Sequence, residues 1–445
     1  MGGVTAYMSS PNHLRPVGLF ESFHVYRHFL GLDSGVVSSA TYTNVERAIL
    51  IKENIFPALR KVIETHPSLA VRLEAEDSKP VFVRLETIEL SLVVQFTDNN
   101  DLEAAIQGQL SRPFDTSTQL PLWRVEVLND GTVVLIFHHG IGDGLSGVAF
   151  HQSLLTALQG VIVGDDSPLV VVPPSLSLRP PIEAVTSLWP SLGKIFAELF
   201  ALFAPASWAP LHSAWTANPV SQTPDIKPLV KLMAFSSAEM SGFAKVCRSH
   251  GATVTSALYV LACATASRLV PPNAPQYKTL SAYVAISLRG VAGAPAAAMC
   301  DYVSAHHTFP PVHPAFSWPA AKAYAAELQR QRRTAREEIG MLMFLFGNVA
   351  AFLRGKLGSK RGATFEVSNV GRVALADSES GPWRVGRMTF AQCDVVIGAA
   401  LKLNVIGDPT GAVTVTLTWG EDAIERTLVE SFAAQFQDGL RALIV

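Results

Sequence analysis

The chain is short of the features that mark disulfide-bonded, metal-binding or polyanion-binding proteins. In 445 residues it has four cysteines, which lie far apart in apolar surroundings and show no metal-ligand spacing: Cys247, Cys263, Cys300 and Cys393. We expect buried thiols in a reducing compartment. The 35 basic and 37 acidic residues leave a formal charge of -2, which predicts no diffuse attraction to nucleic acid or anionic membranes.

Targeting signals and a serine nucleophile motif are missing as well. The first residues lack the basic start and apolar stretch of a signal peptide, and Ala6 stands where a myristoylation signal needs Ser or Thr. We therefore expect a cytoplasmic protein. No Gly-x-Ser-x-Gly elbow is present, so nothing points to a covalent acyl-enzyme.

What the chain does have is enough apolar sequence for two sizeable cores. It is 49% hydrophobic and 16% charged, which excludes a disordered protein, and its length predicts two units. We expect an N-terminal lobe over residues 1–167, a proline-rich crossover over 168–228 and a C-terminal lobe over 229–445. The apolar helix expected at 191–203 is interrupted by charges and too short to span a bilayer. Packing over the lobe junction is favoured, with membrane contact as the alternative.

Both halves mix helix-like and strand-like patterns, which predicts an α/β protein with mixed sheets rather than a doubly wound fold. Hairpins are expected over 71–83 and 123–137 and around a turn at 407–411, and single strands over 280–288 and 302–309. The periodic segments predict helices over 20–30, 45–65, 238–249, 253–268, 320–338 and 424–443.

The most specific feature is the run His138-His139-Gly140-Ile141-Gly142-Asp143-Gly144, which follows an apolar strand. Imidazole has an unperturbed pKa near 6.5, so it can accept a proton from a hydroxyl group at cellular pH and return it later. We expect the glycines to allow a tight reversal with backbone angles closed to other residues. The pattern predicts a general base at the end of the strand.

Two other interpretations of this run are possible. The histidines could be satisfied core residues, with Asp143 capping the next helix; the glycine and aspartate spacing favours the catalytic interpretation. Metal binding is disfavoured, because adjacent histidines point to opposite sides of a strand and no further ligands cluster nearby in the sequence.

The motif resembles the active-site signature of the CoA-dependent acyltransferase superfamily, which includes condensation domains, plant alcohol acyltransferases and fungal alcohol O-acetyltransferases. Other segments along nearly the whole chain are similar to landmarks of that superfamily, and the opening is most like the alcohol acetyltransferases. These segments are Leu14–Glu21 with Arg27 and Gly31, His66–Leu69, Arg112–Asp115, Pro121–Arg124, Gly251–Thr255, Ser287–Arg289 and Phe365–Gly371. The plant branch's Asp-Phe-Gly-Trp-Gly motif is absent, which argues against that branch.

The resemblance implies two lobes of the chloramphenicol-acetyltransferase type with an active-site tunnel between them. It also implies that His139, the second histidine, is the base. His138, Asp143 and Gly144 would then be structural, with Arg289 as the ionic partner of Asp143. The resemblance implies acetyl-CoA or another acyl-CoA as co-substrate and no permanently bound cofactor.

Further site residues are expected in the second half of the chain. Acyl transfer builds negative charge on the thioester oxygen, and Ser368 and Asn369, at a strand end, are candidate donors to it; a plain strand-end turn is the alternative. Basic residues of a nearby loop could hold the CoA phosphates or be merely solvated: Arg354, Lys356, Lys360 and Arg361.

The function expected is transfer of an acetyl or short acyl group to the hydroxyl of a small, apolar secondary metabolite by a monomeric enzyme. Two alternatives stay open. The donor could be bound to a carrier protein or the acceptor could be an amine, as in condensation domains, or the chain could be a binding member of the fold without turnover.

Overall fold

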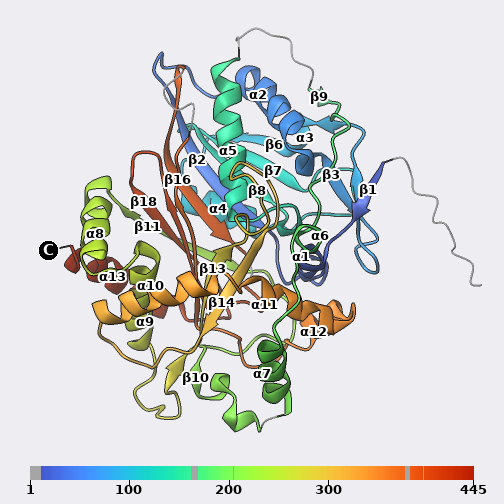
Figure 1. Cartoon of the computed structure of the whole chain (residues 1–445). Helices are drawn as coiled ribbons and strands as arrows, with labels where there is room; N and C mark the ends of the chain where they lie inside the picture. The colour runs from blue at the N-terminus through green and yellow to red at the C-terminus, as the bar shows by residue number, and fades with distance from the viewer. Residues whose placement is uncertain (1–11, 162–168, 204, 376–380, 394, 445) are drawn as a thin grey trace, which may run out of the picture.

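The protein is built on two β-sheets of five and six strands, each covered by helices (Figure 1). The computed structural model describes residues 12–161, 169–203, 205–375, 381–393 and 395–444. The mixed α/β architecture expected from the sequence is confirmed. Each sheet faces a large apolar core of its own, and a third cluster of buried side chains lies between the two halves.

The first sheet has the strand order β16-β2-β8-β7-β6. Its strands are β2 (Val36–Asn44), β6 (Val94–Thr97), β7 (Trp123–Leu128), β8 (Thr132–Phe137) and β16 (Trp383–Gln392). Strands β7 and β8 form the expected antiparallel hairpin. Every residue of β8 is buried, as its continuous apolar sequence predicts, and the strand leads directly into His138.

Five helices accompany this sheet: α1 (Leu19–Phe29), α2 (Lys52–Thr65), α3 (Leu90–Val93), α4 (Leu102–Leu110) and α5 (Gly144–Gln159). Helix α5 packs on β2 and β16 with α2 beside it, and α1 packs on the turn that follows β8. Helix α2 begins at Lys52, later than the expected residue 45. Arg47 has a φ of 62°, a left-handed conformation that a right-handed helix cannot contain.

Short strands complete the first half and the crossover. One small sheet has the order β1-β4-β3, and two strand pairs are β5 with β9 and β10 with β12. The expected hairpin over 71–83 is formed by β3 and β4. The bounds are β1 (His13–Pro16), β3 (Val71–Glu74), β4 (Val81–Arg84), β5 (Ile88–Glu89), β9 (Val170–Val171), β10 (Ala214–Trp215) and β12 (Thr279–Leu280).

The second sheet has the order β11-β18-β17-β15-β13-β14. Its strands are β11 (Pro228–Phe235), β13 (Ala282–Ser287), β14 (Val303–Thr308), β15 (Phe365–Arg372), β17 (Leu401–Gly407) and β18 (Val413–Gly420). Strands β17 and β18 form the expected hairpin. Strand β15 pairs in parallel with β13 and β17, so the sheet is mixed.

The helices of the second half are α8 (Ser237–Ser249), α9 (Val254–Ser267), α10 (Trp318–Gln331), α11 (Arg336–Gly340), α12 (Val349–Arg354) and α13 (Arg426–Ala442). Helix α9 is apolar all round and buried, between α8, α10 and α13. Thr253 caps its start, because the Thr253 hydroxyl accepts a hydrogen bond from the Ser256 amide. The single helix expected over 320–338 is instead divided into α10 and α11.

A strand from the second half of the chain completes the first sheet. Strand β16 pairs antiparallel with β2 along its length, so in Figure 1 an orange strand lies beside a blue one. We expected a contiguous C-terminal lobe over residues 229–445, and this expectation does not include a strand of that segment in the first sheet. Pairing between residues about 350 apart in sequence leaves no local signal that a pattern could reveal.

The crossover carries α6 (Ile182–Val185), α7 (Leu192–Phe203) and the 3₁₀ turns η3 (Ala206–Trp208) and η4 (Pro210–Ser213). The expectation that residues 191–203 pack over the lobe junction is wrong. Leu192, Phe196 and Phe200 are each at least 64% exposed, and α1, α4 and α12 supply buried helical side chains between the halves. Contact of α7 with a membrane stays a prediction. None of the described helices is both long and apolar enough to cross a bilayer.

Candidate active site

The two histidines of the turn after β8 have different surroundings. The 3₁₀ helix η2 (His139–Ile141) begins directly after His138, whose Nδ1 accepts a hydrogen bond of 2.9 Å from the amide of Gly140. Because Nδ1 accepts, the proton of neutral His138 lies on Nε2. Both imidazoles are buried, His138 at 1% and His139 at 8% exposure. His138 is therefore tied to the backbone of the turn, as a structural neighbour would be.

The glycines of the motif are needed because there is no room for a side chain, and not because of their backbone angles, which corrects our expectation. None of Gly140, Gly142 and Gly144 has a φ in the left-handed region, and the φ of 178° at Gly142 is ordinary extended backbone. A Cβ on Gly142 would lie 2.7 Å from Cβ of Ser146, and one on Gly144 would lie 2.7 Å from Cζ of Phe390. Any side chain here would push the turn away from α5 or β16.

Asp143 and Arg289, the expected partners, form a buried ion pair. Asp143 also caps α5: its Oδ1 accepts from the Ser146 amide at 3.2 Å. The Arg289 guanidinium donates further hydrogen bonds to the carbonyls of Ala298 and Cys300 at 3.1 and 3.3 Å. Asp143 thus connects the first sheet to a loop of the second half and has no capacity left for a proton-transfer role.

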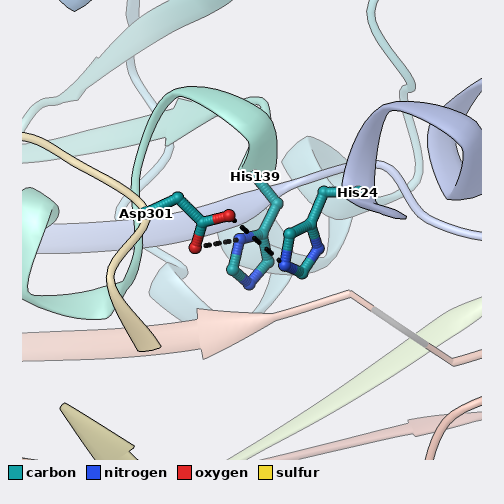
Figure 2. Close-up of side chains that lie close together, drawn as sticks. All are labelled: His24, His139 and Asp301. Atoms are coloured by element: carbon teal, nitrogen blue, oxygen red, sulfur yellow. Dashed lines mark ion pairs between the residues drawn. The ribbon is translucent and has the colours of Figure 1, made fainter. Parts of the chain in front are cut away.

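His139 faces two residues that the sequence analysis did not single out, His24 and Asp301 (Figure 2). The imidazole of His24, on α1, stacks on that of His139 with ring centroids 3.7 Å apart and planes 5° from parallel. Asp301 lies on the loop before β14; its Oδ1 is 3.8 Å from Nδ1 of His139 and its Oδ2 is 3.5 Å from Nε2 of His24. All three side chains are buried.

Besides His24 and His139, the site has a second pair of neighbouring histidines, His28 and His138. Nδ1 of His28 lies 3.2 Å from a carboxylate oxygen of Glu76, and its Nε2 accepts from the Phe114 amide at 3.1 Å. The ring of His28 is 4.6 Å from that of His138. Both nitrogens of His28 are therefore engaged, which leaves no lone pair for a ligand or substrate.

His24, His139 and Asp301 bring three potential metal-ligand atoms within 4.8 Å of one another. Their geometry does not suit an ion. The lone pairs of imidazole lie in the ring plane, and two parallel rings stacked 3.7 Å apart cannot both direct their lone pairs at one ion held about 2 Å from each nitrogen. The group is better suited to sharing protons.

Burial sets the charge state of these groups. It lowers the pKa of His139, an effect that Asp33 opposes and Arg27 reinforces. Burial also lowers the pKa of His24 well below 6.5, helped by neighbouring His139 and Arg27. The pKa of Asp301 is raised well above 3.8, first by burial and then by the carboxylates of Asp143 and Glu21. His139 is thus neutral at neutral pH, the form in which an imidazole accepts a proton.

The two candidate oxyanion donors differ in what they already bind. The side-chain amide of Asn369 donates to Oγ1 of Thr255 at 3.0 Å, and its Oδ1 accepts from the Gly371 amide at 2.9 Å. Both candidates lie inside β15 and not at a strand end, which corrects our expectation, and the bonds of Asn369 lie where the pairing of β15 with β17 is irregular, between Asn369 and Gly371. Ser368 is buried in β15 opposite Asn404 of β17.

The basic loop does not present the three expected phosphate ligands. Arg361 is 2% exposed, and its guanidinium donates to the carbonyls of Val396 and Gly398 at 2.8 and 2.9 Å. It is a structural cation, so its assignment to CoA is wrong. Nζ of Lys360 donates to the His212 carbonyl at 3.0 Å, and Lys356 lies over the ring of Phe352. Both lysine side chains are at the surface.

A cleft of about 440 Å³ adjoins the motif. Gly140 and Ile141 of the turn line it together with Met299, Cys300 and Tyr302, which flank Asp301. The volume lies in the range of small-molecule sites. The lining also includes Arg15 and Arg179.

His24 and Asp301 are the site residues that the sequence analysis missed. A signal existed for His24: Glu21, His24, Arg27 and His28 recur at three- and four-residue intervals and are all buried in α1. Ionisable residues on the inner face of a helix cost free energy unless they are paired, so they mark a site. Asp301 lies in a loop and has no such periodicity.

The family model for alcohol acetyltransferases matches residues 16–289 and 316–440, most of the chain. The chain belongs to the alcohol acetyltransferase family. It is 26% identical over 462 residues to "Probable alcohol acetyltransferase FCK4" of Fusarium pseudograminearum (strain CS3096), covering 94% of this chain and 93% of that protein. The resemblance noted from the motif is therefore confirmed.

Solved structures agree on the fold. Trichothecene 15-O-acetyltransferase TRI3 from Fusarium sporotrichioides superimposes with a TM-score of 0.68 at 13% identity, covering 96% of this chain and 94% of that one. The first condensation domain of the calcium-dependent antibiotic synthetase superimposes with a TM-score of 0.62 at 14% identity over 97% of both chains. The family match shows an acyltransferase enzyme, and these structures show that its fold is the one shared by acetyltransferases and condensation domains.

Proposed function

We propose that this alcohol acetyltransferase-family enzyme moves an acetyl or short acyl group from acyl-CoA to the hydroxyl of a small, apolar metabolite. The observation that carries the proposal is the neutral, buried imidazole of His139 at the end of β8, beside a cleft of ligand size. The relatives named for acetyl transfer to alcohols support the choice of acceptor and donor.

The chemistry is one direct transfer. His139 removes the proton of the acceptor hydroxyl as its oxygen bonds to the thioester carbon. The carbon–sulfur bond then breaks, and the proton on His139 passes to the CoA thiolate, so the products are an ester and free CoA. Ser368 is the proposed donor to the thioester oxygen, where one good hydrogen bond is worth about 3 kcal/mol.

The proposal also covers the location, the oligomeric state and the binding partners of the enzyme. We propose a cytoplasmic, monomeric enzyme of secondary metabolism that holds no permanent cofactor and does not bind nucleic acid. Lys356 and Lys360 remain the proposed contacts to the CoA phosphates, since both are surface cations.

The test is to incubate the purified chain with acetyl-CoA and a panel of small apolar alcohols while free thiol and ester are measured. We expect ester and thiol in equal amounts, and a fall in kcat of about 10²- to 10⁴-fold for His139→Ala. A His139→Ala variant as fast as the parent would overturn the mechanism.

One alternative has a specific observation in its favour. The condensation-domain neighbour, which covers 97% of both chains, fits a donor carried on a protein or an amine acceptor. Parallel reactions with an acylated carrier protein and with amines discriminate the two functions. Turnover of these substrates without turnover of free acyl-CoA and alcohols would favour the alternative, and binding without any product would indicate a member that lacks catalysis.

A further inference from the structure

The carboxyl group of Asp301 is fully buried and has no hydrogen-bonded partner among the described residues. Its two oxygens face two imidazoles, one each, and neither Nδ1 of His139 nor Nε2 of His24 has a hydrogen-bond partner in any other described residue (Figure 2). Leaving such buried groups without hydrogen bonds destabilises the folded protein. A fold that keeps four unsatisfied atoms face to face suggests that they interact during the reaction.

Arg27 determines which ring nitrogen of His24 carries the proton. A guanidinium nitrogen of Arg27 lies 3.5 Å from Nδ1 of His24. Because a guanidinium only donates, Nδ1 of His24 is the acceptor and its proton lies on Nε2. That proton faces Oδ2 of Asp301 at 3.5 Å, so His24 presents a donor to the carboxyl group.

The ion pair of Asp143 and Arg289 holds Asp301 in place through the backbone on either side of it. The Cys300 carbonyl accepts from the Asp143 amide at 3.2 Å, and the Tyr302 amide donates to Oδ2 of Asp143 at 3.3 Å. The Cys300 amide also donates to Oγ of Ser146 at 3.1 Å. The residues before and after Asp301 are therefore fixed to the motif that carries His139.

We propose that Asp301 is the positioning residue of His139: it accepts the proton on Nδ1 and thereby leaves the lone pair of Nε2 free for the acceptor hydroxyl. The inference rests on the proposed function and deepens it. The separation of 3.8 Å closes to a hydrogen bond in the substrate complex, as catalytic hydrogen bonds commonly do. His24 orients Asp301 from the other side and covers one face of the His139 ring.

The proton balance of the step is simple. The acceptor hydroxyl gives its proton to Nε2 of His139, the imidazole becomes a cation, and the adjacent carboxylate of Asp301 balances that buried charge. The proton on Nε2 then leaves with the CoA thiolate, while the one on Nδ1 stays. Burial raises the pKa of Asp301 and lowers those of His24 and His139, which brings their proton affinities together and favours this sharing.

Two other pairs of charged groups lie close to the site. Arg27 and Asp33 form an ion pair of 3.1 Å close to His24, and Asp143 is paired with Arg289. Both pairs are internally compensated. Asp301 is thus the carboxyl group that His139 faces directly.

Nitrogen-15 NMR of the histidine rings tests the inference without any substrate. The His139 signals are assigned by their loss in His139→Gln. We expect Nδ1 of His139 to be protonated in the parent, and the Nε2-protonated tautomer to grow in Asp301→Asn, because the new amide donates to Nδ1. The kcat of Asp301→Asn should fall by about 10²- to 10⁴-fold with the KM for the alcohol within about threefold.

Two variants keep the test specific. Asp408→Asn changes another buried aspartate, which accepts from the Thr410 amide in the β17–β18 turn, and should leave both the tautomer and kcat unchanged. His24→Phe keeps a stacked ring and should lower kcat less than Asp301→Asn does. An equal or greater fall would assign the positioning role to His24 instead.

An unchanged His139 tautomer in Asp301→Asn, or an Nε2-protonated parent, would overturn the inference. Failure of the proposed function has a different signature, because a His139→Ala variant as fast as the parent leaves the NMR result intact. The Asp301→Asn replacement keeps the volume of the side chain, so it leaves no cavity in the buried site.

Discussion

Arg289 extends from the end of β13 in the second sheet to Asp143 at the start of α5, and their ion pair joins the two halves of the protein beside His139. Both side chains are about 5% exposed or less. The pair also organises the loop of Ala298 to Tyr302 through Ser146 and backbone hydrogen bonds. The motif aspartate therefore acts on the site by fixing Asp301.

Breaking this pair should destabilise the protein strongly. Asp143→Ala leaves the Arg289 charge buried and uncompensated, so we expect a loss of about 3–5 kcal/mol in the free energy of unfolding, measured by urea denaturation. The double variant Asp143→Leu with Arg289→Met should lose less than the sum of the single variants, because it leaves no unpaired charge. Arg60→Ala, which breaks an exposed pair with Glu64, should cost less than about 1 kcal/mol.

The space around Gly144 supports a second prediction. A Cβ at this position would lie 2.7 Å from Cζ of Phe390 and 2.9 Å from Cγ1 of Val370. We expect Gly144→Ala to cost about 1–3 kcal/mol in unfolding free energy, and Phe390→Leu to restore part of the loss. Gly108, inside α4, has open space where its Cβ would be, so Gly108→Ala should instead stabilise by about 0.5–1 kcal/mol.

These glycines show what the sequence could and could not predict. The pattern of the motif located the turn after β8 and the base candidate, because two histidines, an aspartate and a glycine at fixed spacing are a local signal. It did not show why Gly144 is needed, since the nearest atoms that exclude a side chain there belong to Phe390 of β16, more than 200 residues away. The place of Asp301 in the site and the place of β16 in the first sheet also depend on residues distant in sequence, so neither could be predicted. Strands β7 and β8, in contrast, were predictable from their own sequences.

The two oxyanion candidates should separate in kinetics and stability. Ser368→Ala should lower kcat by about 10²- to 10³-fold with little change in unfolding free energy, if its hydroxyl binds the developing oxyanion. Asn369→Ala removes bonds to Thr255 and Gly371 and should destabilise the protein by about 1–3 kcal/mol. The measurements are steady-state kinetics and urea denaturation of both variants. Full activity of Ser368→Ala would remove it from the mechanism.

The residues of the basic loop should also differ in whether their replacement changes stability or the KM for acetyl-CoA. Arg361→Met leaves the carbonyls of Val396 and Gly398 without their donor, so we expect a loss of about 2–4 kcal/mol in unfolding free energy. Lys356→Ala and Lys360→Ala should keep stability and raise the KM for acetyl-CoA several-fold, since a surface cation near phosphate contributes roughly 1 kcal/mol. The matched measurement is the KM for acetyl-pantetheine, which lacks the nucleotide phosphates and should not respond.

The buried histidines should make the protein sensitive to acid. Burial lowers the pKa of His151 to about 4, and the same cause lowers that of His66 to about 4. Below pH 6.5 the unfolded chain binds protons at these groups that the folded chain does not, so stability falls as pH falls from about 6.5 toward 4. A shift of this size at fully buried His151 corresponds to about 3 kcal/mol. Urea denaturation across this range should show the loss, and His151→Gln should make stability fall less steeply with pH.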